Sequence, residues 1–235
     1  LKNFTKNKLI SFNKIKKFEF DIIILSPGIN IKKCKLKNFL KKNYKIIYTD
    51  LDVFYSFYKN QCITITGTNG KSTSCQLLYE VLKQKGLDVK LAGNIGYPIL
   101  STKNIKRKSI IVIEASSYQL DYSQLFTAKY VAILNISPDH LERHGTLKNY
   151  ILAKFKLIQN QNKGSIAFVN KRDKHLQKEI KKNKYKSRIV KVETNLKERI
   201  TEIFQNNYFL SASNKENLAF VIEIAKIFKV KKIEL

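Results

Sequence analysis

Apolar residues change their spacing along the chain, and each change predicts an element. Residues 61–66 (QCITIT) form a short β-branched run, which is typical of a buried strand. Residues 72–85 follow with helical spacing, and Gly86 stands where a C-terminal cap belongs. One face of this expected helix carries Leu77, Leu78, Val81 and Leu82. The pattern therefore predicts a strand and a helix joined by a turn that contains Gly67 and Gly70.

Strand and helix patterns continue to alternate downstream. Further strands are expected at 109–114, 130–136, 165–170, 188–193 and, as a short pair around a QNNY turn, within 200–210. Further helices are expected at 147–160 and 214–229, and a solvated one within 171–188. Upstream, 20–25 and 45–48 are expected to be short strands. The alternation predicts an α/β fold with a mostly parallel sheet flanked by helices.

Composition adds outer limits to this picture. The 235 residues are 43% hydrophobic, which is enough for one large domain or two small ones. No apolar run approaches the roughly 20 residues that span a bilayer, and the first residues lack a signal-peptide pattern. The three cysteines form no C-x-x-C pair, so we expect reduced thiols and a cytoplasmic location. The chain has no methionine, which suggests a fragment or a processed form.

The net charge of +27 is the most unusual feature of the composition. It allows a basic nucleic-acid-binding protein as one hypothesis, because phosphate contacts need lysine and arginine. However, the lysines are spread along the whole chain, and no aromatic-interleaved motif accompanies them. A general lysine bias therefore explains the charge better than a dedicated nucleic-acid surface.

The segment GTNGKST, residues 67–73, has the chemistry of an anion site. Two glycines allow a tight turn in which backbone N–H groups converge, and the N-terminus of the expected helix adds its dipole. Lys71 would add a point charge for outer phosphates, and the Ser72 hydroxyl would suit Mg²⁺. The usual G-x-x-x-x-G-K-[ST] spelling would place glycine at Ile65, so an ordinary strand-to-helix turn remains the alternative.

Two strand ends downstream carry further candidate residues. Glu114 ends the strand at 109–114, where open parallel sheets bind ligands, and it could share a Mg²⁺ with Ser72; an exposed glutamate is the alternative. His140 and His144 resemble the zinc motif H-E-x-x-H. Leu141, however, stands where the glutamate should be, so the spacing argues against a metalloprotease.

Lys154 is an unusual residue in the expected helix at 147–160. It lies at the centre of an apolar face, whereas Lys148 and Lys156 are expected on the polar side. The face consists of Leu147, Tyr150, Ile151 and Ile158. Most such lysines extend along their stems to water, but a buried one can lose its proton and become chemically available.

Taken together, five segments resemble the central domain of the Mur ligases. They are GTNGKST, LAGNIGYPIL (91–100), VIEASSYQLD (112–121), the stretch from 133 to 158, and SASNKENLAFVIEIA (211–225). The shortened phosphate loop is that family's own spelling. LSPGI (25–29) and YTDLDVF (48–54) resemble the end of the family's first domain.

The resemblance implies a domain order. Residues 1–60 would be the latter part of a Rossmann-like UDP-binding domain, and 61–235 a P-loop ATPase-like central domain. The family's C-terminal domain, which binds the amino acid, would be absent. We would then expect a fragment that is inactive alone.

The resemblance also implies roles for individual residues. Lys71, His140 and Lys154 would be catalytic. Mg²⁺-ATP would be held by Gly67, Thr68, Asn69, Gly70, Lys71, Ser72, Thr73, Asn214 and Asn217. One Mg²⁺ would lie on Ser72 and Glu114, and a second on His140 and a carbamylated Lys154. The substrate would be held by Ser26, Gly28, Asn94, Ser116 and His140. Ser213 replaces the histidine of the family's H-N-x-x-N motif.

The implied activity is ATP-dependent amide bond formation through an acyl phosphate. SSYQL (116–120) and DHLERHGTLKNYILAK (139–154) are most similar to the members that add D-glutamate to UDP-N-acetylmuramoyl-L-alanine in peptidoglycan precursor synthesis. A family member that adds a different amino acid is the alternative. The partners would be these small molecules and ATP, with no nucleic acid and no membrane, and the protein would be a monomer.

Overall fold

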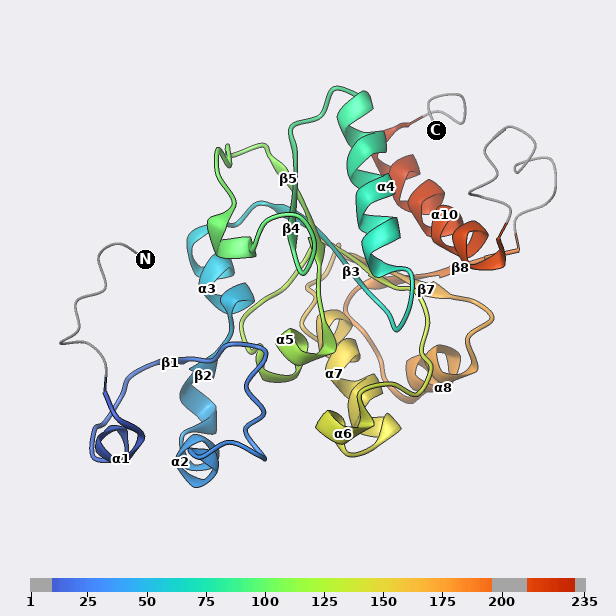
Figure 1. The fold of residues 1–235 in the computed structure, drawn as a ribbon. Coiled ribbons are helices and arrows are strands. Elements are labelled where there is room, and N and C mark those ends of the chain that lie inside the picture. Colours follow the sequence, from blue (N-terminus) through green and yellow to red (C-terminus); the bar gives the residue numbers. More distant parts are fainter. Residues whose placement is uncertain (1–9, 196–210, 231–235) are drawn as a thin grey trace.

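Six parallel strands form the centre of the protein. A computed structural model describes residues 10–195 and 211–230, so the strands expected within 200–210 lie outside the described residues. The sheet has the order β4-β5-β3-β6-β7-β8, and every neighbouring pair is parallel (Figure 1). Its strands are β3 (Gln61–Thr66), β4 (Val89–Gly93), β5 (Ile110–Glu114), β6 (Tyr130–Ile133), β7 (Ile166–Asn170) and β8 (Arg188–Val192). The expected parallel α/β fold is confirmed.

Successive residues of the central strands point to opposite faces of the sheet, and both faces are buried. In β5, Ile111 and Ile113 join one apolar cluster, whereas Ile110 and Val112 join the other. In β6, Val131 and Ala132 divide in the same way. Burial on both sides explains why these strands are continuous apolar runs rather than alternating ones.

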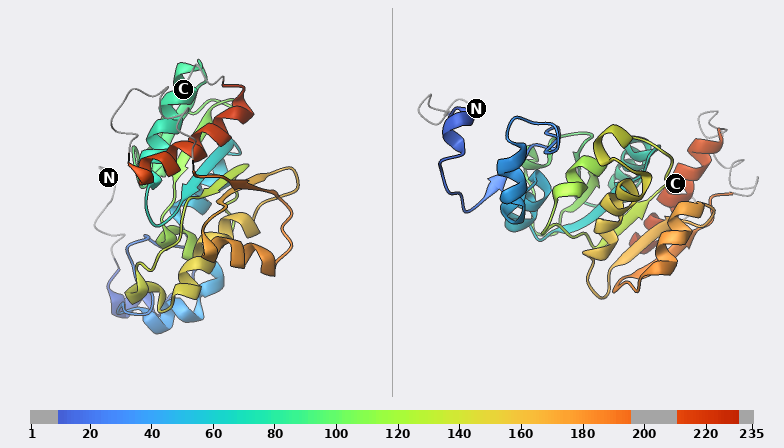
Figure 2. Two further views of the ribbon diagram at one scale, coloured as in Figure 1. Left: turned by 90° about the vertical axis from the view of Figure 1, so that its right-hand side faces the viewer. Right: turned by 90° about the horizontal axis from the view of Figure 1, so that it is seen from below.

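Helices cover each face of the sheet. One face is covered by α4 (Lys71–Gln84) and α10 (Ala212–Ala225), which pack side by side (Figure 1). The opposite face is covered by α3 (Asp50–Phe57), α5 (Ser117–Tyr122), α7 (Leu147–Gln159) and α8 (Lys174–Lys182) (Figure 2). The short helix α6 (Leu141–His144) and the 3₁₀ turns η3 (Ile99–Ser101) and η5 (Lys226–Phe228) complete this part of the chain. No described helix is long and apolar enough to cross a membrane.

The segment before β3 forms a small unit of its own. β1 (Ile23–Ile24) pairs in parallel with β2 (Ile47–Tyr48), and α1 (Phe12–Ile15), α2 (Lys37–Lys42) and the 3₁₀ turn η2 (Tyr44–Ile46) flank them. Its apolar cluster includes Tyr122 of α5, so the unit packs against the helices beside the main sheet.

A buried carboxylate links α3 to the segment that follows α5. Asp52 of α3 is 1% exposed, and its side chain accepts hydrogen bonds from the Ser123 hydroxyl and from the backbone N–H of Gln124, Leu125 and Phe126 at 2.7–3.2 Å. The same side chain completes a capping box with Thr49 at the start of α3. Six donors thus compensate for the burial of one charge.

The elements expected after residue 60 that fall within the described residues are confirmed to within a few residues, with β6 ending at Ile133 rather than at residue 136. The sequence pattern did not predict β4 as a strand. Residues VKLAG form an edge strand with a lysine and a glycine, so they lack the continuous apolar run of the central strands. α3 and α5 are only 8 and 6 residues long and were also not predicted.

A candidate nucleotide site at the carboxyl ends of the strands

The turn between β3 and α4 requires its second glycine. Gly70 has φ of +79°, and a Cβ at this position would lie 2.0 Å from Oδ1 of Asn217 in α10. The turn is tied to the end of β6, because the Thr68 and Asn69 N–H groups donate to the Asn135 side chain at 3.1 and 2.9 Å. The first-turn amides of a helix have no acceptor within the helix. Those of α4 therefore lie at the carboxyl edge of the sheet, where an anion can bind.

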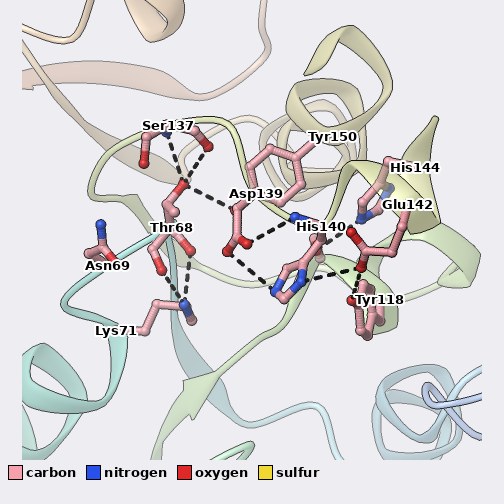
Figure 3. A network of polar contacts seen from close by, with 12 residues as sticks. Thr68, Asn69, Lys71, Tyr118, Ser137, Asp139, His140, Glu142, His144 and Tyr150 are labelled. Carbon is pink, nitrogen blue, oxygen red and sulfur yellow. Dashed lines mark hydrogen bonds and ion pairs between the residues drawn. The ribbon is translucent and has the colours of Figure 1, made fainter. Parts of the chain in front are cut away.

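Lys71 curls back over this loop. Its Nζ donates to the carbonyl oxygens of Gly67 and Thr68 at 3.0 and 2.7 Å (Figure 3). The ammonium is therefore held against the turn that leads into α4. Cation and amides together form one electropositive site.

Glu114 is buried beside the start of α4. It is 1% exposed, and Oε2 accepts from the Ser72 hydroxyl at 2.8 Å while Oε1 accepts from the Asn94 amide at 2.9 Å. The alternative of an exposed strand-end glutamate is therefore wrong. Carboxylate, hydroxyl and amide oxygens are the donors that a hard cation prefers, so these three side chains fit Mg²⁺. The described residues contain no group of three or more His, Cys, Asp and Glu side chains placed to hold a metal.

Lys154 is buried under the phosphate loop. Its side chain is 1% exposed, and Nζ donates to the Gly67 carbonyl at 2.8 Å and to the Thr66 hydroxyl at 3.2 Å. The ammonium also lies 4.6 Å from the ring centre of Tyr150. Burial, and then repulsion by Lys71, lower the pKa of Lys154 from the usual 10.5 to about 7. The alternative in which the side chain extends to water is therefore wrong.

Lys156 differs from the expectation of a solvent-facing residue. It is half-buried, its Nζ donates to the Asp121 backbone carbonyl, and burial lowers its pKa. The helical spacing gave its direction correctly, but α5 packs on that side of α7. Lys148 in the first turn of α7 is exposed.

His140 begins α6 in a left-handed conformation with φ of +53°. Its ring lies 3.4 Å from an oxygen of Asp139, 3.8 Å from an oxygen of Glu142 and 4.9 Å from the ring centre of Tyr118 (Figure 3). His144 has a different partner, since its Nε2 lies 3.0 Å from the Ser117 hydroxyl in a buried position. Burial lowers the pKa of His144.

A cavity of about 370 Å³ brings most of these residues together. It is lined by Pro27, Gly28, Gly67, Lys71, Asn94, Ser116, Ser117, Tyr118, His140, Tyr150 and Lys154. Seven of these were named from the sequence, whereas Ser26 does not line the cavity. Pro27, Ser117, Tyr118 and Tyr150 were not assigned to the site. Tyr150 had a usable signal, because it lies four residues before Lys154 on the same helical face.

Asn217 of α10 reaches the phosphate loop from the face of the sheet that α4 and α10 cover. The Asn217 side chain contacts Gly70, as described above, and Asn214 lies in the first turn of α10, where its N–H donates to the Ser211 hydroxyl at 3.3 Å. Ser213, which replaces the family histidine, is exposed. A larger cavity of about 850 Å³ lies between β4 and α4, and none of the residues named from the sequence lines it.

Residues 65–232 match the family described as the Mur ligase middle domain. Over 169 residues the chain is 42% identical to the UDP-N-acetylmuramoylalanine–D-glutamate ligase of Rickettsia bellii (strain RML369-C), and over 184 residues it is 40% identical to the ligase of the same name from Elusimicrobium minutum (strain Pei191). The matched segments cover 71% and 74% of this chain but only 37% and 40% of those proteins, so the chain spans well under half of their length.

The fold is similar to a crystal structure of UDP-N-acetylmuramate:L-alanyl-gamma-D-glutamyl-meso-diaminopimelate ligase from Neisseria meningitides. The TM-score is 0.62 at 14% sequence identity, over 94% of this chain and 78% of that one. At this identity the likeness concerns the fold alone. The sequence match over residues 65–232 is the stronger evidence, and by it the chain belongs to the Mur ligase family.

Proposed function

We propose that this chain forms the nucleotide-binding part of an ATP-dependent ligase that adds D-glutamate to UDP-N-acetylmuramoyl-L-alanine. The observation that carries the proposal is the cavity that joins Lys71 of the phosphate loop to Lys154, His140 and Gly28. The names of the two bacterial relatives supply the substrate. In this role the protein would work in the cytoplasm, as a monomer, in peptidoglycan precursor synthesis.

The residues around the phosphate loop divide the binding of ATP among them. The amides at the start of α4 and the Lys71 ammonium favour the phosphates. Asn217, which contacts Gly70, and Asn214, one turn earlier on α10, would contact the rest of the nucleotide. Ser72, with Glu114, would hold Mg²⁺, and the ion would neutralise charge on the transferred phosphoryl group.

The substrate would enter from the side of His140 and Gly28. Its carboxylate would attack the terminal phosphate of ATP, which gives an acyl phosphate and ADP. The amine of D-glutamate would then displace inorganic phosphate and form the amide. Attack of one anion on another is slow because like charges repel, so the cations gathered in the cavity are the chain's main contribution.

Lys154 has the properties needed for carbamate formation. With a pKa of about 7, a large part of the side chain is a neutral amine at physiological pH. A neutral amine attacks CO₂ at carbon, and loss of one proton leaves a carbamate with two oxygens and a negative charge. Those oxygens, together with His140, which lines the same cavity, would suit a second Mg²⁺. An ammonium in the same place would repel the ion.

A chemical rescue tests this role. Lys154→Ala should abolish turnover by the complete gene product, and short carboxylic acids should restore part of it by supplying the missing oxygens. Lys148→Ala is the matched control, because Lys148 is exposed on the same helix. Full activity of Lys154→Ala, or a rescue by neutral amides of the same size, would leave Lys154 as a structural residue.

Substrate dependence tests the proposed reaction itself. Phosphate release from ATP by the complete gene product should require both UDP-N-acetylmuramoyl-L-alanine and D-glutamate. If release instead requires meso-diaminopimelate or L-lysine together with the substrate that already carries D-glutamate, the enzyme is a different ligase of the same family. If neither of these two substrate sets supports phosphate release, the proposal is wrong.

A further inference from the structure

Arg143 connects two parts of the chain that are far apart in sequence. It lies in α6, three residues after His140, and is 6% exposed. Its Nη2 donates to the Pro27 carbonyl at 2.9 Å and its Nη1 to the Gly28 carbonyl at 3.3 Å. Both carbonyls belong to the turn that follows β1, and the two contacts span more than 110 residues of sequence.

Aromatic rings complete the surroundings of this guanidinium. Its central carbon lies 4.6 Å from the ring centre of Tyr118 and 5.4 Å from that of Tyr122. The described residues provide no carboxylate within ion-pair distance of Arg143, and Nε has no hydrogen-bond partner among them. The two carbonyls are therefore the backbone acceptors of a buried cation.

A buried cation without a carboxylate is a costly way to stabilise a fold. An apolar residue of similar size would often stabilise the same position equally well. A planar guanidinium, in contrast, can hold two neighbouring carbonyls at once and stack on rings, which lysine cannot do. The geometry therefore favours a role in positioning the turn.

The turn held in this way forms one wall of the cavity. Pro27 and Gly28 line the same cavity as Gly67 and Lys71 of the phosphate loop. The turn is closed by the Ile29 N–H, which donates to the Ser26 carbonyl at 3.0 Å. Gly28 has no positive φ, and a Cβ added to it would find no atom within 4 Å. Gly28 is therefore needed neither for the backbone conformation nor for packing, and the space beside it is open to a ligand.

We propose that Arg143 is a positioning residue that clamps the Pro27–Gly28 turn onto the cavity and so sets the affinity for the sugar-nucleotide substrate, but not for ATP. The proposal rests on the ligase function given above. His140 caps the short helix α6 and Arg143 lies within it. The same helix therefore positions His140, which lines the cavity, and holds the Pro27–Gly28 turn, which also lines it. The hydrogen bonds that Arg143 donates among the described residues go to Pro27 and Gly28 and not to the phosphate loop, so ATP binding should be unaffected.

Hydrogen exchange on the 235-residue chain tests the clamp without reference to activity. In Arg143→Lys, amides of a peptide covering residues 25–31 should exchange at least about tenfold faster, since loss of hydrogen bonds to a charged group is of that size. The β3 peptide, residues 61–66, should be unchanged. Arg188→Lys, at an exposed arginine of β8, is the control. Unchanged exchange at 25–31 in folded Arg143→Lys would overturn the clamp.

Calorimetry then separates the two ligands. In the complete gene product, UDP-N-acetylmuramoyl-L-alanine should bind Arg143→Lys about tenfold or more weakly, whereas a non-hydrolysable Mg²⁺-ATP analogue should bind within about twofold of the wild type. Gly28→Ala should fold normally and weaken only the sugar nucleotide, with no change in exchange. Equal weakening of both ligands in Arg143→Lys would overturn the selective role. If the wild type fails to bind the sugar nucleotide while the exchange result holds, the clamp stands and the proposed function fails.

Discussion

Replacing Lys154 by methionine should change how the stability of the fold depends on pH. Methionine is unbranched and similar in length, so it can fill the same space without a titrating group. Lys154 has a pKa of about 7 in the folded chain, against 10.5 for an ordinary lysine. Each pKa unit corresponds to about 1.4 kcal/mol, so protonated Lys154 destabilises the fold by about 5 kcal/mol relative to its neutral form.

The sign follows from the order of the two pKa values. Between pH 7 and 10.5 the unfolded chain binds more protons at this residue than the folded chain does, so wild-type stability rises with pH. The destabilisation is complete below pH 7 and is lost as the pH approaches 10.5. From pH 7 to pH 9, the free energy of unfolding of the wild type should therefore rise by about 2 kcal/mol relative to Lys154→Met.

Urea denaturation at pH 7, 8 and 9 in CO₂-free buffer measures this difference. The absolute stability of the variant at one pH is a poor test, because methionine also removes the hydrogen bonds that Lys154 donates to the Thr66 hydroxyl and the Gly67 carbonyl. Groups common to both proteins cancel when the two pH profiles are subtracted. Lys148→Met should keep the wild-type profile, since Lys148 is exposed. Parallel profiles for wild type and Lys154→Met would refute the lowered pKa, and with it the basis for carbamate formation.

Three further substitutions test other parts of the structure. Lys71→Ala should weaken binding of Mg²⁺-ATP at least about tenfold in equilibrium titrations, because the charge aimed at the phosphates is removed, and unchanged affinity would contradict the site. Gly70→Ala should destabilise the fold by about 1–3 kcal/mol in urea denaturation, since its φ is positive and the new Cβ would meet Asn217; a neutral result would contradict the geometry. Asp52→Asn should cost roughly 3 kcal/mol or more in the same assay, because an amide N–H₂ would face backbone donors, whereas Asp21→Asn, at an exposed site, should be silent.

Local patterns explain which parts of this protein were predictable from its sequence. The strand, turn and helix around Gly70 are consecutive, so spacing and residue type were enough to predict them. Spacing also placed Lys154 on the apolar face of its helix, because helical periodicity states which residues share a face, but it left open whether the side chain is buried or extends to water. Lys156 shows the limit of the same argument. Periodicity gave the direction of the Lys156 side chain but not the neighbouring helix α5, whose Asp121 carbonyl accepts a hydrogen bond from Lys156 Nζ.

Contacts between distant segments were not predictable in this way. Arg143 bonds to carbonyls 115 and 116 residues earlier, and Tyr150 lies 3.1 Å from the hydroxyl of Thr68, 82 residues earlier. No spacing rule connects such positions, since they meet only once the sheet order is set. The candidate site therefore divides into a local half, which the motif contains, and a half built by topology.

The carbonyl oxygen of Gly67 connects the chemistry of the two central lysines. It accepts hydrogen bonds from Lys71 at 3.0 Å and from Lys154 at 2.8 Å, so two ammonium groups share one acceptor. Their repulsion contributes to the low pKa of Lys154. A phosphate group bound to Lys71 would offset that repulsion and favour the proton on Lys154. A carbamate would have the opposite charge and would attract Lys71 away from the phosphate unless a cation lay between them. Carbamate, metal and nucleotide are therefore expected to bind as a mutually dependent set, because each one alone leaves an uncompensated charge beside Gly67.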